Sequence, residues 1–142
     1  QFAGIRDPLV DVLAARWPGT RRPWLRISRP VGAGRGAKSA LIALMGAGAL
    51  SRLATAAGLP HGAVLSGVYD FQGDAHRYAG LLGQWLADSP DRAVVMCHPA
   101  TTPAPGDGIA AARIREFAVL SAVDPSIHQV RLARGSELFA SL

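Results

Sequence analysis

The chain has 142 residues, 49% of them hydrophobic, and a formal net charge of +5 that is carried by arginine with a single lysine, Lys38. This length and this apolar fraction suit a single domain over residues 1–142, in which the lone cysteine, Cys97, excludes an internal disulfide. Beyond position 35 the basic residues are scattered, which argues against nucleic acid as a partner, and the longest apolar run, residues 40–50, is about half the length of a membrane span.

The N-terminal segment predicts a helix. Asp7-Pro8 is typical of a helix start, because aspartate caps free amides and proline suits the first helical position. Apolar residues then share one face at helical spacing: Leu9, Val10, Leu13, Ala14 and Trp17. We expect this helix to end before Pro18-Gly19.

A short strand, a glycine-rich loop and a second helix are predicted next. Residues 23–30, PWLRISRP, form the expected strand between two prolines, and residues 31–38, VGAGRGAK, form the loop. The helix that follows covers about residues 38–57 and ends at Gly58. Because it is apolar nearly all round, we expect most of it to be buried.

The second half of the chain predicts further strands and an amphipathic helix. A strand lies within residues 61–71, and Asp74 caps the helix after it. One apolar stripe of this helix is made of Tyr78, Leu81, Leu82, Trp85 and Leu86. Residues 92–97, RAVVMC, read as a continuous apolar strand of the kind that parallel sheets cover on both faces.

The C-terminal third continues this alternation. A loop over residues 100–108 leads to a helix that Asp107 caps, and a short strand over 129–134 precedes a short helix over 136–142. The capped helix is expected to bury Ala110, Ile114, Phe117 and Ala118. Strands that alternate with helices indicate an α/β fold with about four parallel strands, which is half of a (β/α) barrel or a small open sheet.

The glycine-rich loop is a candidate nucleotide-binding site. Gly32, Gly34 and Ala37 match the pattern G-x-G-x-x-G/A between a strand and a helix, where phosphates can approach the backbone. No acidic residue follows about 20 positions later to hold a ribose, and Ala37 stands where a phosphate loop needs glycine before Lys38. A flexible connection is the interpretation that we favour, and phosphate binding through Gly32–Lys38 is the alternative.

His98 is the second candidate, because it comes directly after a predicted parallel strand. The carboxyl ends of such strands are where α/β proteins place their sites, and Pro99 stiffens the exit. A neutral imidazole there can act as general acid or base near pH 7, and the alternative is a histidine that is hydrogen-bonded at the sheet edge. On a strand Cys97 points to the opposite face, so we expect a buried thiol rather than a nucleophile. The four histidines are spread along the chain without metal-ligand spacing, so no metal site is expected within it.

Three segments resemble the C-terminal half of the YdjC-like carbohydrate deacetylases, which include chitooligosaccharide deacetylases and hopanoid-biosynthesis-associated members. They are GVYDFQGDAHRYAGLLGQWL (67–86), VVMCHPA (94–100) and DGIAAARIREFAVL (107–120). The opening residues 1–17 and 23–30 look like the segment just after that family's H-x-H-x-H motif. The resemblance covers essentially the whole chain and implies that it is the C-terminal part of a distorted (β/α) barrel.

The resemblance also implies an activity and a site. Members of the family remove N-acetyl groups from amino sugars with a divalent metal, Mg or Zn, that activates water, while a separate group protonates the leaving amine. Only the His-Pro histidine carries over, as His98, in the role of general acid or contact to the acetyl group; Ala100 replaces a frequent glycine. Arg26 and Arg29 are expected to bind sugar hydroxyls or to orient a carboxylate. The family's metal ligands have no counterpart in this chain, so we expect it to be inactive alone.

Partners and location follow from the same interpretation. The expected partner is an N-acetylated sugar or oligosaccharide. The chain opens without an initiator Met, as a fragment would, so a missing N-terminal half or a homodimer is expected to complete the barrel. A non-catalytic remnant or interaction domain is the other open interpretation. Without a signal-peptide pattern or a membrane span, a cytoplasmic location is expected.

Overall fold

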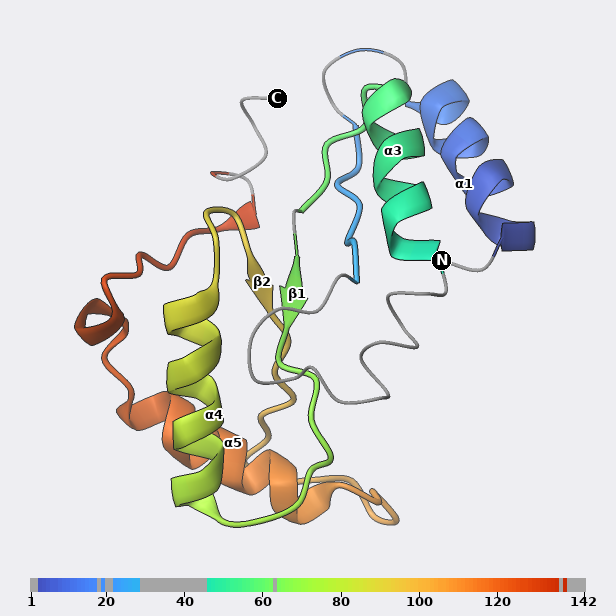
Figure 1. Cartoon of the computed structure of the whole chain (residues 1–142). Helices are drawn as coiled ribbons and strands as arrows, with labels where there is room; N and C mark the ends of the chain where they lie inside the picture. Colours follow the sequence, from blue (N-terminus) through green and yellow to red (C-terminus); the bar gives the residue numbers. More distant parts are fainter. Residues whose placement is uncertain are drawn as a thin grey trace.

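The computed structural model describes residues 3–17, 19, 22–28, 46–62, 64–135 and 137. Within these, the elements follow in the order α1 (Ala3–Arg16), α3 (Gly48–Ala56), β1 (Leu65–Ser66), α4 (Ala75–Asp88), β2 (Val94–Val95), α5 (Ala110–Ala122) and the 3-10 turn η3 (Pro125–His128). Helices α1 and α3 lie side by side at one end of the molecule, α4 and α5 lie at the other, and the strands run between them (Figure 1). The fold is therefore α/β.

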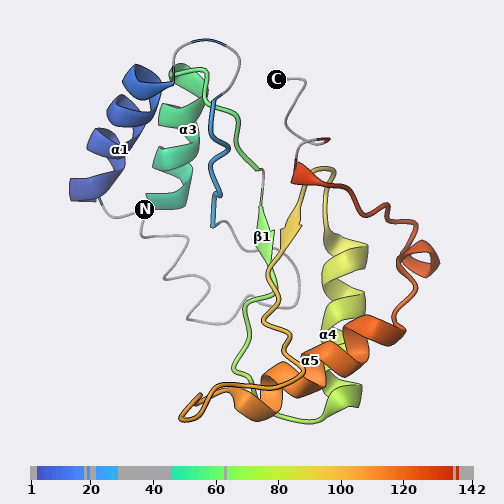
Figure 2. The same cartoon turned by 180° about the vertical axis from the view of Figure 1, so that it is seen from behind.

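The strands confirm a parallel arrangement on a smaller scale than expected. In β1 and β2, Leu65 pairs with Val94 and Ser66 with Val95. A parallel bridge also joins Leu25 to His61, and the segment 22–28 lies on the side of β1 away from β2 in both views (Figures 1 and 2). The described residues form no closed barrel.

The predicted strand over residues 129–134 is absent from the structure. Gln129 adopts a left-handed conformation with φ 56°, and the N–H of Val130 donates to the carbonyl of Pro125 in η3. After this turn Val130 packs against buried residues of α4, whereas Leu132 is 72% exposed, and none of residues 129–134 pairs with β1 or β2.

Gly67 allows the chain after β1 to run directly beside the chain after β2. Its φ is +90°, and a Cβ at this position would lie 2.1 Å from the carbonyl oxygen of Met96. Only glycine has both the conformational freedom and the space that this approach requires. The two segments consequently leave the sheet side by side. Residues 68–71 and residues 97–100 therefore begin next to each other.

Helix α1 begins earlier than predicted. It starts at Ala3 rather than at Asp7-Pro8, and Pro8 lies inside it. Because proline has no N–H, the carbonyl of Gly4, four residues earlier, loses its helical hydrogen bond. Gly4 is exposed, so water can bind this carbonyl instead. The predicted apolar face is confirmed only in its centre, where Val10 is buried, whereas Trp17 is 41% exposed.

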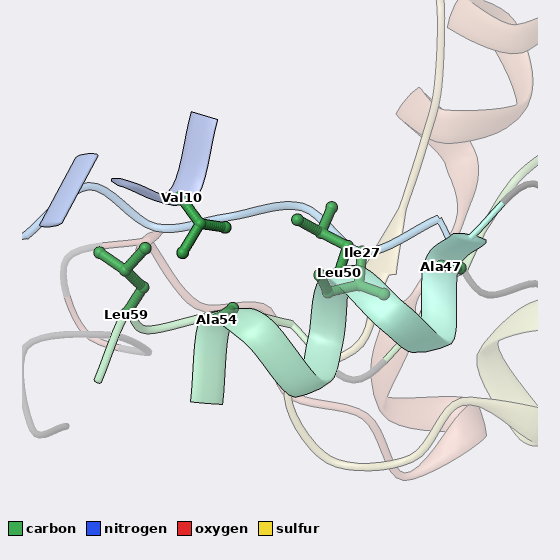
Figure 3. Close-up of a cluster of buried hydrophobic side chains, with 6 residues drawn as sticks. All are labelled: Val10, Ile27, Ala47, Leu50, Ala54 and Leu59. Carbon is green, nitrogen blue, oxygen red and sulfur yellow. The ribbon is translucent and has the colours of Figure 1, made fainter. Parts of the chain in front are cut away.

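The second predicted helix is described only from residue 46 onward. Helix α3 ends as expected, with Gly58 in a left-handed conformation at φ 64°, but it is not buried all round. Leu50 and Ala54 face inward, whereas Arg52 faces solvent. Together with α1 and segment 22–28, α3 forms a buried group that we term the aliphatic cluster (Figure 3), made of Val10, Ile27, Ala47, Leu50, Ala54 and Leu59.

Helix α4 matches its prediction closely. The side chain of Asp74 accepts a hydrogen bond from the backbone N–H of Arg77 at 2.9 Å and so caps the helix. The predicted stripe faces inward and forms what we term the aromatic cluster, whose buried members are Tyr78, Leu82, Trp85 and Leu86. Tyr69 and residues of α5 pack against it.

Helix α5 presents a different face from the one predicted. Its buried residues are Ala112 and Glu116, whereas Ile114 and Phe117 are 48% and 43% exposed. Polar contacts of Glu116 to the chain beneath it hold the helix in this rotation. Among the described helices, none has the length and apolar character needed to cross a membrane.

Candidate functional site

His98 lies three residues beyond the end of β2. The strand ends at Val95, earlier than the predicted Cys97, but Met96 still donates its N–H to the carbonyl of Ser66 at 3.0 Å. The chain therefore keeps its direction along β1 and places His98 past the carboxyl end of the strand pair. Its side chain is 24% exposed, which leaves the ring accessible from one side.

The carboxylate of Glu116 contacts both the backbone and the ring of His98. Glu116 is fully buried, and its Oε2 accepts a hydrogen bond from the backbone N–H of His98 at 2.5 Å. Its Oε1 accepts a hydrogen bond from the hydroxyl of Tyr69 at 2.7 Å and lies 3.8 Å from Nδ1 of His98. That nitrogen is buried and makes no hydrogen bond within the described structure, and the carboxylate is the polar group that faces it.

Arg113 holds the chain on both sides of Pro99. Its Nη1 donates to the carbonyl of His98 at 3.2 Å, while its own carbonyl accepts from the N–H of Ala100 at 3.2 Å. The guanidinium is fixed in turn by Asp107, whose Oδ2 lies 2.6 Å from Nε. The first turns of α5 therefore bind the backbone of the His-Pro-Ala segment, and Glu116 of the same helix lies beside its imidazole.

One aromatic ring packs against the imidazole, and a tyrosine lies behind it. Phe71 meets the His98 ring edge to face, with centroids 5.2 Å apart and planes at 78°. Phe71 has a left-handed backbone, φ 63°, which is strained for an aromatic residue, and Nη2 of Arg115 donates to its carbonyl at 2.9 Å. Burial, and then the hydrogen bond to Glu116, raise the pKa of Tyr69 to about 12. Its phenol is therefore a hydrogen-bond donor at neutral pH.

Cys97 is no partner for His98. Its Sγ lies 3.6 Å from the hydroxyl of Tyr78 on α4, whereas the His98 ring faces α5, so the two neighbouring side chains point to different elements. Burial is also the main reason why the pKa of the Cys97 thiol is raised. The expectation of a thiol that packs in the interior is met in part, because the residue is only half-buried.

Of the two arginines predicted to bind substrate, Arg26 lies within the described residues and Arg29 does not. Arg26 is exposed, and its Nη1 lies 3.9 Å from Sδ of Met96, two residues before His98. Arg26 therefore lies near the chain that leads out of β2, but it contacts Met96 and not His98. Arg29 and the loop Gly32–Lys38 lie outside the described residues, so both predictions about them stay predictions.

The described residues do not form a metal centre. Over this part of the chain, no three His, Cys, Asp or Glu side chains are close enough together to hold an ion. His61 instead shares a 2.9 Å hydrogen bond with Oγ1 of Thr55. The divalent metal that the family resemblance implies finds no ligand set among these residues.

Comparison with known proteins gives no match to a family model, to a curated protein or to a solved structure. What the site can do therefore rests on its own geometry and on the resemblance of its segments.

Glu116 is the site residue that sequence reasoning missed. A glutamate in an amphipathic helix is ordinarily solvent-exposed, and its position in the predicted helix gave no reason to expect otherwise. One signal was present, because Glu116 falls at helical spacing between Ala112 and Leu120, on the stripe that packs against α4. A lone carboxylate on an apolar stripe is the kind of residue that needs a buried partner.

Proposed function

We propose that this chain is the C-terminal part of a YdjC-like carbohydrate deacetylase, in which His98 delivers the proton to the leaving amine of an N-acetylated sugar. The observation that supports this most is the pairing of His98 with the buried carboxylate of Glu116, just beyond the carboxyl end of a parallel strand. General acids in hydrolases combine these properties: a partly exposed imidazole and a fixed carboxylate behind it.

Hydrolysis of the N-acetyl group requires a proton donor for the leaving amine, and this is the role proposed for His98. Water adds to the acetyl carbonyl carbon, the C–N bond breaks, and its electron pair stays on the amine nitrogen, which must gain a proton. With Nδ1 of His98 turned toward Glu116, Nε2 is the ring nitrogen left for that transfer. In the proposed step Nε2 takes up the proton that the attacking water releases, which makes the ring an imidazolium, and then gives this proton to the amine nitrogen. The resemblance assigns activation of the water to a metal held by segments that have no counterpart here. We therefore propose that the chain binds the sugar but turns it over poorly by itself.

Ligand titration followed by NMR tests the binding half of this proposal. The His98 ring signals of the isotope-labelled 142-residue chain should shift on addition of di-N-acetylchitobiose, while those of the exposed His76 on α4 should stay in place. Cellobiose, which has the same linkage without acetamido groups, is the matched ligand control. If millimolar di-N-acetylchitobiose leaves His98 unmoved, the proposed substrate class is wrong.

An activity assay tests the other half. Amine release from N-acetylated chito-oligosaccharides is measured for the 142-residue chain with added Mg²⁺, Zn²⁺ or Co²⁺. We expect at most a trace of product under each condition. Robust turnover would contradict the proposed dependence on other segments, and loss of that turnover in His98→Ala would still support the role of the imidazole.

A further inference from the structure

We infer that Glu116 is the positioning residue for His98: it selects which ring nitrogen of His98 is presented for proton transfer. The catalytic meaning of this inference rests on the proposed function, but the geometry does not. A histidine has two distinct ring nitrogens, and the hydrogen-bonding surroundings of one decide the chemistry of the other. At this site the surroundings of Nδ1 are set by a single carboxylate, at 3.8 Å.

Both oxygens of Glu116 are held, which makes the carboxylate a fixed reference for the ring. Oε2 accepts from the backbone N–H of His98, so the carboxylate cannot move away from the residue that it orients. Oε1 accepts from the hydroxyl of Tyr69 and also faces the ring of His98. A carboxylate accepts hydrogen bonds and donates none, so the tautomer that suits this arrangement carries its hydrogen on Nδ1. The lone pair of the neutral ring is then on Nε2, the nitrogen that must first take up the proton that it later delivers.

The other charged and polar groups around His98 make their hydrogen bonds away from Nδ1. From α5, Arg113 donates to the carbonyl of His98, and Arg115 is directed to the carbonyl of Phe71. From the segment after β1, Tyr69 supplies a neutral hydroxyl, because its pKa is raised to about 12, and from α4 Tyr78 faces the Cys97 thiol. Among the described groups that contact this site, Glu116 thus supplies the acceptor that faces Nδ1, at 3.8 Å, which is a charge contact and longer than a hydrogen bond.

Burial strengthens the effect of the Glu116 carboxylate on the His98 ring. A carboxylate without access to water costs several kcal/mol unless it is paired and hydrogen-bonded, so the protein places one here only together with its partners. In a site of low dielectric constant the orienting effect of a fixed charge is also stronger than in water. A solvent-exposed carboxylate at the same distance would be screened and free to rotate.

The tautomer of His98 is the direct test. Long-range ¹H–¹⁵N spectra of the full 142-residue chain report which nitrogen of each neutral ring carries the hydrogen. We expect wild-type His98 to be mainly in the Nδ1–H form. In Glu116→Gln the amide can turn its NH₂ group toward the ring, and the population should shift substantially toward the Nε2–H form. Glu137→Gln, the same change at the other glutamate of the chain, should leave His98 as in wild type.

Each outcome bears on the inference. An Nε2–H tautomer in the wild-type chain overturns it even if Glu116→Gln fails to fold, because the wild-type spectrum needs no variant. A folded Glu116→Gln protein with an unchanged His98 tautomer overturns it as well, and circular dichroism establishes the folding. If the tautomer behaves as expected while di-N-acetylchitobiose leaves His98 unmoved, the positioning role stands and the proposed function fails.

Discussion

The aliphatic cluster and the aromatic cluster are built from different chemistry. The buried side chains that join α1, segment 22–28 and α3 in the aliphatic cluster are all hydrocarbon (Figure 3). The aromatic cluster instead encloses polar atoms, because Tyr78 meets the Cys97 thiol and the neighbouring Tyr69 holds the carboxylate of Glu116. A protein that needed only stability at this place could use an apolar residue instead of a buried carboxylate.

This difference assigns separate tasks to the two ends of the molecule. The aliphatic cluster stabilises the fold by removing apolar surface from water, and it tolerates other apolar side chains that fill the same volume. The aromatic cluster has to keep particular oxygen and nitrogen atoms at fixed distances, so its tolerance is narrower. Changes in the first cluster should therefore affect stability alone, whereas changes in the second should also reach His98.

The largest loss of stability is expected from a substitution at Gly67, where the segments that follow β1 and β2 lie closest together. In Gly67→Ala the new Cβ would lie 2.1 Å from the carbonyl oxygen of Met96, at a residue with φ +90°. Backbone strain and overpacking, of about 1–3 kcal/mol each, should together lower the free energy of unfolding by roughly 2–6 kcal/mol. Chemical denaturation measures this loss, and the His98 signals should change in whatever fraction remains folded.

Gly80→Ala is the matched control for that substitution. Gly80 lies within α4, and a Cβ there would meet no atom within 4 Å. Alanine is favoured over glycine inside a helix by about 1 kcal/mol, so this variant should be more stable than wild type. Equal losses in the two variants would show that the approach of Gly67 to Met96 is not what limits the structure.

A pair of leucine truncations compares the clusters directly. Leu50→Ala in the aliphatic cluster and Leu82→Ala in the aromatic cluster both empty a buried site, and each should cost about 2–5 kcal/mol of stability. NMR spectra should separate them, because only Leu82 packs with the rings that lead to His98. The comparison breaks down if Leu50→Ala disturbs the His98 ring signals as much as Leu82→Ala does.

Helix α4 shows what could be predicted from the sequence. Its cap, Asp74, and its apolar stripe both depend on local rules, the hydrogen bonding of free amides and the 3.6-residue repeat, and both are confirmed. The parallel pairing of β1 with β2 was likewise predictable from the alternation of elements. These features need no knowledge of which distant residue each side chain meets.

Helix α5 shows where such rules fail. Counting apolar residues favoured Ile114 and Phe117 as the buried face, yet the helix turns Glu116 inward. The reason is a tertiary one: the partners of Glu116, Tyr69 and His98, come from segments 47 and 18 residues away, and no local pattern announces them. His98 itself was predictable from its place after a strand, whereas the group that orients it was not.

Removal of the Tyr69 hydroxyl should have an intermediate effect with a clear pH dependence. Tyr69→Phe leaves the buried Glu116 with one hydrogen-bond donor fewer, which should cost about 1–3 kcal/mol near neutral pH. In wild type, Tyr69 ionises near pH 12 when folded and near pH 10 when unfolded. Between these values the unfolded chain releases a proton that the folded chain retains, so stability should fall as the pH rises from 10 to 12.

The difference in stability between wild type and Tyr69→Phe isolates the contribution of Tyr69 to the pH dependence. Burial also raises the pKa values of Tyr78 and Cys97, so both wild type and Tyr69→Phe should lose stability in alkali. Denaturation midpoints measured from pH 8 to 12 should converge for the two proteins above pH 10, because the variant lacks one of the groups that favour unfolding there. Parallel curves across this range would mean that Tyr69 ionises alike in the folded and the unfolded chain.

The smallest effect tests which face of α5 is buried. Ile114 is 48% exposed, so Ile114→Gln should change the free energy of unfolding by no more than about 0.5 kcal/mol. The same substitution at Ile27, which is 1% exposed in the aliphatic cluster, should cost more than about 2 kcal/mol, because the amide would be buried without a partner. If the two variants lost similar amounts, Ile114 would be buried after all. Helix α5 would then be rotated from its present position, and Glu116 could not be the residue that faces His98.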